Sequence, residues 1–178
     1  MLSPRNFPVV VIGAGPVGLV AAAHLSQRGL PFLVLEAGST VGTAVRRWAH
    51  VRMFSPWRFN LDPLAAQLLA AIGWPTPPSE GNPTGGELVA RWLEPLAAHP
   101  ALHPFLRLQH RVIAVARLGR DKLGGHDRVG RPFVVRVATP HGEEEILARA
   151  VIDASGAVPN PLGACGLPAL GEAAVAEW

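Results

Sequence analysis

The sequence contains no tyrosine, a single cysteine, Cys165, and one lysine against fifteen arginines. One cysteine can form neither an intramolecular disulfide nor a C-x-x-C redox pair, which excludes disulfide-reductase chemistry within this chain. Cys165 has no identifiable base partner, so we interpret it as a small loop residue. The absence of tyrosine also counts against a reductase that depends on a catalytic Tyr-x-x-x-Lys pair.

Long apolar runs are missing as well. No stretch reaches the roughly 20 residues of a membrane span, and no secretory signal is recognisable, so we expect no membrane partner and a cytoplasmic location. The net charge of +3 is spread over clusters that apolar residues interrupt, so we expect no nucleic-acid partner. His103, His110 and His126 lack metal-ligand spacing, and we expect no metal site.

The segment from residue 9 to 36 has the layout of a dinucleotide-binding βαβ unit. An apolar run at 9–12 predicts a buried strand, a helix is expected from Pro16 to Arg28, and a second strand is expected at 32–35. Glu36 follows that strand, about 20 residues after the glycines, where a carboxylate can accept hydrogen bonds from ribose hydroxyls. A carboxylate there also repels a 2′-phosphate, which favours FAD or NAD over NADP.

Three glycines connect the first strand to the helix. Gly13 permits a sharp turn, Gly15 leaves room for a pyrophosphate, and Gly18 permits close packing of helix and sheet. The alternative is a tight turn that binds nothing. The residues of this unit that we expect to bind a cofactor are Gly13, Ala14, Gly15, Pro16, Val17, Gly18, Glu36, Ala37 and Gly38.

Residues 37–60 show no sustained periodicity but are rich in arginine and aromatic residues. Because this segment follows the ribose-binding carboxylate, Arg46, Arg47 and Trp48 are candidates for contact with phosphate or an isoalloxazine ring. The alternative is that the aromatic residues fill the seam between sheet and helices. Those aromatic residues are Trp48, Phe54 and Trp57.

The rest of the chain predicts a helical insertion at about 61–98 and then strands. Asp62 is the expected N-cap of a helix that ends at Gly73, and a second helix from Gly86 to Ala98 buries Trp92. Strands are expected at 105–108, 111–118, 133–138 and 146–152, and they form a three-stranded meander at about 111–152 whose last strand returns to the main sheet. Small residues end that strand near the cofactor, namely Ala154, Ser155 and Gly156. The predicted fold class is therefore α/β, a Rossmann-like parallel sheet with helices plus an antiparallel meander.

With these motifs the sequence resembles the N-terminal half of the FAD-dependent, NAD(P)H-using oxidoreductases of the glutathione-reductase-like class, and most closely the flavin-containing monooxygenase-like flavoproteins. The resemblance implies that residues 13–18 are the FAD pyrophosphate loop and that Glu36 is the ribose-binding acid. Residues 41–48 look like a degraded G-G-x-W segment beside the flavin, which implicates Arg47 and Trp48. The resemblance also places the backbone near Val112 at the adenine and identifies 151–156 with the hydrophobic-A-T/S-G motif.

The chain lacks the second glycine fingerprint that binds NADPH in that family. We therefore expect residues 1–178 to be a single FAD-binding domain, from a truncated gene product or an excised domain, and NADPH only in a full-length protein. No catalytic residue is identified, the small-molecule substrate is unknown, and a homodimer is an open expectation. Two alternatives remain, a single-site NAD-dependent Rossmann reductase and a non-catalytic nucleotide-binding remnant.

Overall fold

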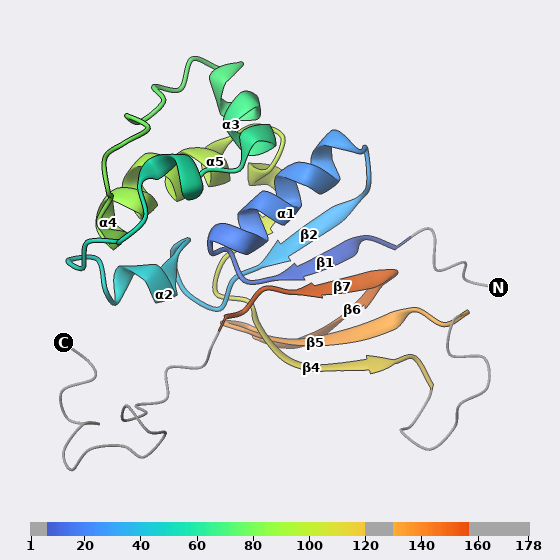
Figure 1. Cartoon of the computed structure of the whole chain (residues 1–178). Coiled ribbons are helices and arrows are strands. Elements are labelled where there is room, and N and C mark those ends of the chain that lie inside the picture. Colours follow the sequence, from blue (N-terminus) through green and yellow to red (C-terminus); the bar gives the residue numbers. More distant parts are fainter. Residues whose placement is uncertain (1–6, 120–129, 157–178) are drawn as a thin grey trace, which may run out of the picture.

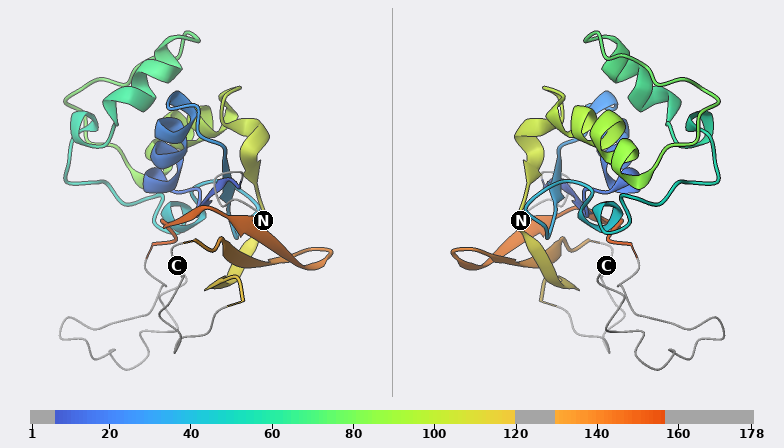
Figure 2. Two further views of the ribbon diagram at one scale, coloured as in Figure 1. Left: turned by 90° about the vertical axis from the view of Figure 1, so that its right-hand side faces the viewer. Right: turned by 90° about the vertical axis from the view of Figure 1, so that its left-hand side faces the viewer.

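The computed structural model describes residues 7–119 and 130–156 of the chain. These residues form three layers, namely helices, a four-stranded parallel sheet and a three-stranded antiparallel sheet (Figures 1 and 2). The predicted α/β fold class is confirmed. The expectations for Cys165 and for His126 lie outside the described residues.

The parallel sheet is built on the predicted βαβ unit. Strand β1 (Val9–Ile12) leads into helix α1 (Pro16–Gln27), which returns the chain to β2 (Phe32–Leu35). The sheet has the order β3-β2-β1-β7, with β3 at Leu106–Arg107 and β7 at Ala150–Asp153, and all its neighbouring strands are parallel. The carboxyl ends of β1, β2 and β7 therefore lie at one edge of the sheet.

The sheet is buried on both faces because successive side chains point to opposite sides. Val9, Val11 and Val34 pack in the core beneath the helices. Val10 and Leu33 pack instead against Val135 and Val137 of the antiparallel sheet. This double burial explains why the first two strands read as continuous apolar runs rather than alternating ones.

The antiparallel sheet has the order β4-β5-β6, and its strands span Arg111–Arg117, Phe133–Thr139 and Gly142–Ala148. The expected single strand at 146–152 is wrong, because two strands meet there. β6 ends at Ala148, and β7 begins at Ala150 in the other sheet, while the Arg149 N–H donates to the Pro8 carbonyl at 3.0 Å. The chain thus passes between layers at Arg149, and apolar content alone does not mark that step.

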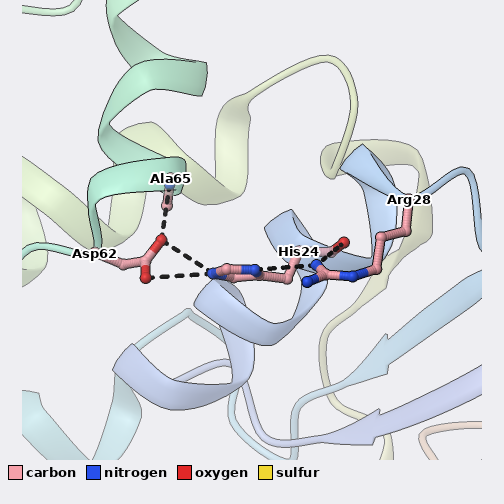
Figure 3. Close-up of polar contacts among 4 residues, drawn as sticks. All are labelled: His24, Arg28, Asp62 and Ala65. Atoms are coloured by element: carbon pink, nitrogen blue, oxygen red, sulfur yellow. Dashed lines mark hydrogen bonds and ion pairs between the residues drawn. The ribbon is translucent and has the colours of Figure 1, made fainter.

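The helical insertion lies over α1 (Figure 1). Helix α3 (Pro63–Ala70) starts at the predicted N-cap, where the Asp62 carboxylate accepts a hydrogen bond from the Ala65 N–H at 2.9 Å. The same carboxylate lies 3.2 Å from His24 Nε2 of α1, and His24 Nδ1 lies 3.1 Å from an Arg28 Nη1 donor (Figure 3). Since arginine only donates, His24 Nδ1 is the acceptor. The ring proton is then on Nε2, which donates a hydrogen bond to the Asp62 carboxylate.

The predicted second helix is present, with Trp92 fully buried as expected, but it is not a regular α-helix. It runs through α4 (Gly85–Leu88), a π-helical segment η3 (Val89–Leu93) and α5 (Glu94–Ala98). Pro95 has no N–H and its ring clashes with the carbonyl four residues earlier, which disturbs the regular helix at Arg91. The Arg91 carbonyl instead accepts a hydrogen bond from Trp74 Nε1 at 3.0 Å.

Three shorter elements complete the described chain. Two of them, α2 (Thr43–Arg46) and η2 (Trp57–Phe59), lie in the segment between residues 37 and 60 that was expected to be irregular. The third, η4 (His103–Phe105), precedes β3.

Candidate cofactor-binding site

The glycine corner between β1 and α1 is held by contacts that exclude side chains at two of its three glycines. Gly13 has a φ of +98°, and a Cβ there would lie 2.7 Å from the Ala154 carbonyl oxygen. A Cβ on Gly18 would lie 1.9 Å from the Gly13 carbonyl oxygen. A Cβ on Gly15 would meet no atom within 4 Å. Gly13 and Gly18 are thus required by packing, whereas Gly15 faces open space.

The first turn of α1 also faces this open space. Gly15 is the N-cap and no side chain caps the helix. Helix N-terminal N–H groups without an internal partner, together with the positive end of the helix dipole, favour an anion. Open space above Gly15 beside uncapped backbone donors fits a phosphate group, which would supply the missing acceptors.

Glu36 lies beside the glycine corner and is nearly buried, with 8% of its surface exposed. Its Oε2 accepts a hydrogen bond from the Ala14 N–H at 2.7 Å, and its Oε1 accepts one from the Gly38 N–H at 2.8 Å. Each carboxylate oxygen has a further lone pair, so the group can still accept a donor from a ligand. The bond from the Ala14 N–H also connects the loop after β2, which begins with Glu36, to the loop after β1.

A cavity of about 270 Å³ opens at the carboxyl ends of β1, β2 and β7. It brings together eight of the residues that the sequence nominated, from four separate segments, namely the glycine corner, the stretch from Glu36 to Arg47, the start of β4 and the end of β7. They are Gly13, Glu36, Ala37, Gly38, Arg47, Val112, Ser155 and Gly156. Ligand pockets commonly measure about 300 to 1,000 Å³, so this cavity suits one part of a dinucleotide rather than all of it.

Eight nominated residues lie outside the cavity lining: Ala14, Gly15, Pro16, Val17, Gly18, Arg46, Trp48 and Ala154. Ala14 and Gly18 are buried supports of the corner, and Val17 is 68% exposed on the first turn of α1. Trp48 packs against Gly85, where an added Cβ would lie 2.5 Å from its ring. Its contact with a flavin stays a prediction, because helix packing already accounts for the side chain.

The large side chains of the 37–60 segment divide between the two interpretations. Trp57 is 3% exposed and belongs to the core, as the seam interpretation expects, whereas Phe54 is 99% exposed and fills no seam. Arg46 donates to Glu94 Oε1 at 2.5 Å, and its neighbour Arg47 faces the cavity. Two adjacent arginines therefore have different surroundings.

The end of β7 is closed by a local turn. The Asp153 carboxylate accepts hydrogen bonds from the Ser155 hydroxyl at 2.7 Å and from the Ser155 N–H at 3.1 Å. The side-chain bond, followed by the backbone bond, holds the pKa of Asp153 below its usual value. This turn fixes the approach of Ser155 and Gly156 to the cavity.

Sequence reasoning did not nominate five of the lining residues, which are Ile12, Leu35, Thr43, Ala44 and Arg111. Thr43 and Ala44 lie in α2, a helix of one turn that is too short to give a periodic signal. Arg111 begins β4 directly before Val112, so its neighbour was a usable signal. In the described ranges, no group of three or more His, Cys, Asp or Glu side chains could hold a metal ion.

No helix in the described part of the chain is long and apolar enough to span a bilayer. This agrees with the lack of long apolar runs in the sequence.

Comparison with known proteins places these features in context. Residues 11–73 match the NAD(P)-binding Rossmann-like domain. The flavin-containing monooxygenase FMO GS-OX-like 2 of Arabidopsis thaliana is 46% identical over 55 residues, which are 31% of this chain and 11% of that protein.

Two solved structures extend the similarity to most of the chain. OTEMO in complex with FAD and NADP is 25% identical, with a TM-score of 0.63 over 92% of this chain and 27% of the other. A double mutant of the flavin monooxygenase from Stenotrophomonas maltophilia is 30% identical, with a TM-score of 0.60 over 89% of this chain and 42% of the other. The chain therefore spans less than half the length of each of these proteins. Residues 11–73 are thus similar to an NAD(P)-binding Rossmann-like domain, and flavin monooxygenases are among the homologues and structural neighbours of the chain.

Proposed function

We propose that this chain is the FAD-binding portion of an NAD(P)H-dependent flavoprotein oxidoreductase of the monooxygenase type, and that its cavity holds the ADP moiety of FAD. The observation that carries the proposal is the convergence on one cavity of the glycine corner, Glu36 and the end of β7. These three segments are far apart in the sequence. The matched proteins that contain FAD in their structures support the choice of cofactor.

Each segment has a distinct part in binding. The N–H groups at the uncapped start of α1 would hold the pyrophosphate above Gly15. Glu36 would accept a hydrogen bond from the ribose through the lone pairs that Ala14 and Gly38 leave free. Val112 would border the adenine, with Ser155 and Gly156 closing the opposite approach.

FAD, when bound, supplies the electron transfer, and this chain contributes binding, orientation and exclusion of water. The ionisable groups in the described cavity lining are Glu36, Arg47 and Arg111, and Glu36 already accepts two backbone hydrogen bonds, so we assign these residues to binding. Turnover with NAD(P)H is therefore proposed for a longer protein that also holds the nicotinamide. The oxygenated substrate belongs to that longer protein too.

A second candidate is an NAD site, because the matching domain is described as NAD(P)-binding. Titration of the purified chain with FAD, monitored by flavin fluorescence and repeated with excess NAD, separates the two. Saturable FAD binding that NAD does not reverse supports the proposal. Binding of NAD with no uptake of FAD supports the alternative, and binding of neither removes both. An NADH oxidation assay on the FAD-loaded chain then tests whether it is a nucleotide-binding module without turnover.

A further inference from the structure

Among the described residues, the cavity lining carries more positive than negative charge. Its lining contains three ionisable residues, Glu36, Arg47 and Arg111. Glu36 is 8% exposed and both its oxygens already accept backbone hydrogen bonds, whereas Arg47 and Arg111 are exposed. A ligand that enters the cavity therefore meets two guanidinium groups and little of the carboxylate.

Neither arginine has an acidic partner among residues 7–119 and 130–156. Other arginines of the chain do. Arg46 pairs with Glu94, Arg107 with Glu144 and Arg136 with Glu145. Both arginines that line the candidate cofactor site are thus free of an acidic partner in the described ranges, so their charge is available to a ligand.

The pair comes from different layers of the fold. Arg47 is the C-cap of α2, in the loop after β2, while Arg111 is the first residue of β4 in the antiparallel sheet. Arginine donors form short, charge-assisted hydrogen bonds with phosphate oxygens, and two such groups complement a dianion. The cavity thereby takes its positive charge from two different elements of the fold, α2 and β4.

From these observations we infer that Arg47 and Arg111 form a phosphate-recognition pair, so that the cavity selects nucleotides by the charge of their phosphate chain. The inference rests on the proposed function, and it adds two residues that discriminate ADP from adenosine. Arg111 is then a binding residue in its own right rather than a structural start of β4. Glu36 already accepts two backbone hydrogen bonds. The preference of the site for ligands of a given charge therefore depends on Arg47 and Arg111 as well as on Glu36.

The test is calorimetric titration of wild-type chain and of Arg47→Gln and Arg111→Gln with ADP and adenosine, at low and at raised salt. Arg136→Gln is the matched control, because it removes an exposed arginine on β5 outside the cavity. Each cavity variant should weaken ADP binding by about tenfold at low salt, as expected for loss of one charge-assisted contact, and by less as salt rises. Adenosine binding should be unchanged, and circular dichroism verifies that each variant is folded.

The possible outcomes separate the two proposals. If wild-type chain binds ADP and FAD but the cavity variants behave like Arg136→Gln, the inference fails and the proposed function stands. If the variants weaken ADP and adenosine equally, or equally at all salt concentrations, the arginines act by packing and the inference is overturned. If wild-type chain binds neither FAD nor ADP, both proposals fall.

Discussion

Glu36 accepts a hydrogen bond from the Ala14 N–H at 2.7 Å, across 22 positions of sequence. This bond joins the loop after β2 to the glycine corner after β1, and the Gly38 N–H completes it on the other carboxylate oxygen. A residue that sequence patterns assign to ligand binding thus also holds the binding site together.

Glu36→Gln should therefore lower stability even without a ligand. An amide has one acceptor oxygen where the carboxylate has two, so one of the two backbone N–H groups loses its partner at a cost of about 1 to 3 kcal/mol. Urea unfolding measures the loss, with Glu145→Gln on the exposed face of β6 as the control. Equal stability of the two variants would show that Glu36 has no structural role.

Gly15→Ala should lower FAD affinity with little effect on stability, whereas Gly18→Ala should lower stability. A methyl group at Gly15 meets open space, so the free energy of unfolding should hardly change while FAD affinity falls because the methyl occupies the phosphate position. At Gly18 the methyl collides with the Gly13 carbonyl, and overpacking of this kind costs about 1 to 3 kcal/mol. Thermal unfolding and FAD titration of both variants check this. A Gly15→Ala variant with unchanged FAD affinity would place the pyrophosphate elsewhere.

Trp74→Phe should destabilise the helical layer by about 1 kcal/mol, because the Arg91 carbonyl loses its hydrogen bond from the indole. Pro95→Ala supplies the missing N–H and allows the helix to satisfy that carbonyl itself. A double-mutant cycle on urea unfolding should show a smaller cost of Trp74→Phe in the Pro95→Ala background. Additive effects would mean that the indole bond does not compensate for the proline.

The contact between His24 and Asp62 predicts a pH-dependent contribution to stability. Burial opposes ionisation of the Asp62 carboxyl, but hydrogen bonds from the Ala65 N–H and His24 outweigh it and lower the pKa below the usual 3.8 (Figure 3). A pKa that is lower in the folded chain stabilises it fully above the unfolded value, and this stabilisation disappears as pH falls through the folded value.

Asp62→Asn should therefore be less stable than wild-type chain at neutral pH and should approach it below about pH 4. Urea unfolding at a series of pH values measures the difference. Asp62→Ala is the control, since it also removes the N-cap oxygen and should be about 1 kcal/mol less stable than Asp62→Asn at every pH of the series. A difference between wild type and Asp62→Asn that is independent of pH would contradict this assignment.

The parts of the fold that sequence could predict are those with strong local signals. The bounds of β1, α1 and β2 follow from apolar runs and glycine spacing, and the start of α3 follows from Asp62 and Pro63. The break at Arg149 has no such signal, because β6 and β7 are both apolar at their junction and differ only in the sheet that they join. The π-helical segment was likewise not predicted. The sequence around Pro95 does not show that the Trp74 side chain will donate a hydrogen bond to the Arg91 carbonyl.

The same division holds at the site. Glycine and acid spacing nominated the corner and Glu36, and the resemblance nominated Val112 and Arg47. Glu36, Val112, Arg47 and, from the corner, Gly13 line the cavity, whereas Gly15 and Gly18 do not. Arg111 was not nominated, although its neighbour Val112 was, because the resemblance concerned the backbone near Val112 and not a side chain beside it.

Amide chemical-shift changes on addition of ADP to isotope-labelled chain test the central claim most directly. The account predicts saturable changes at the amides of Gly13, Gly15, Gly38, Val112 and Ser155, and reversal of ADP binding by FAD. Changes confined to other surfaces, or no changes at saturating ADP and FAD, would contradict it.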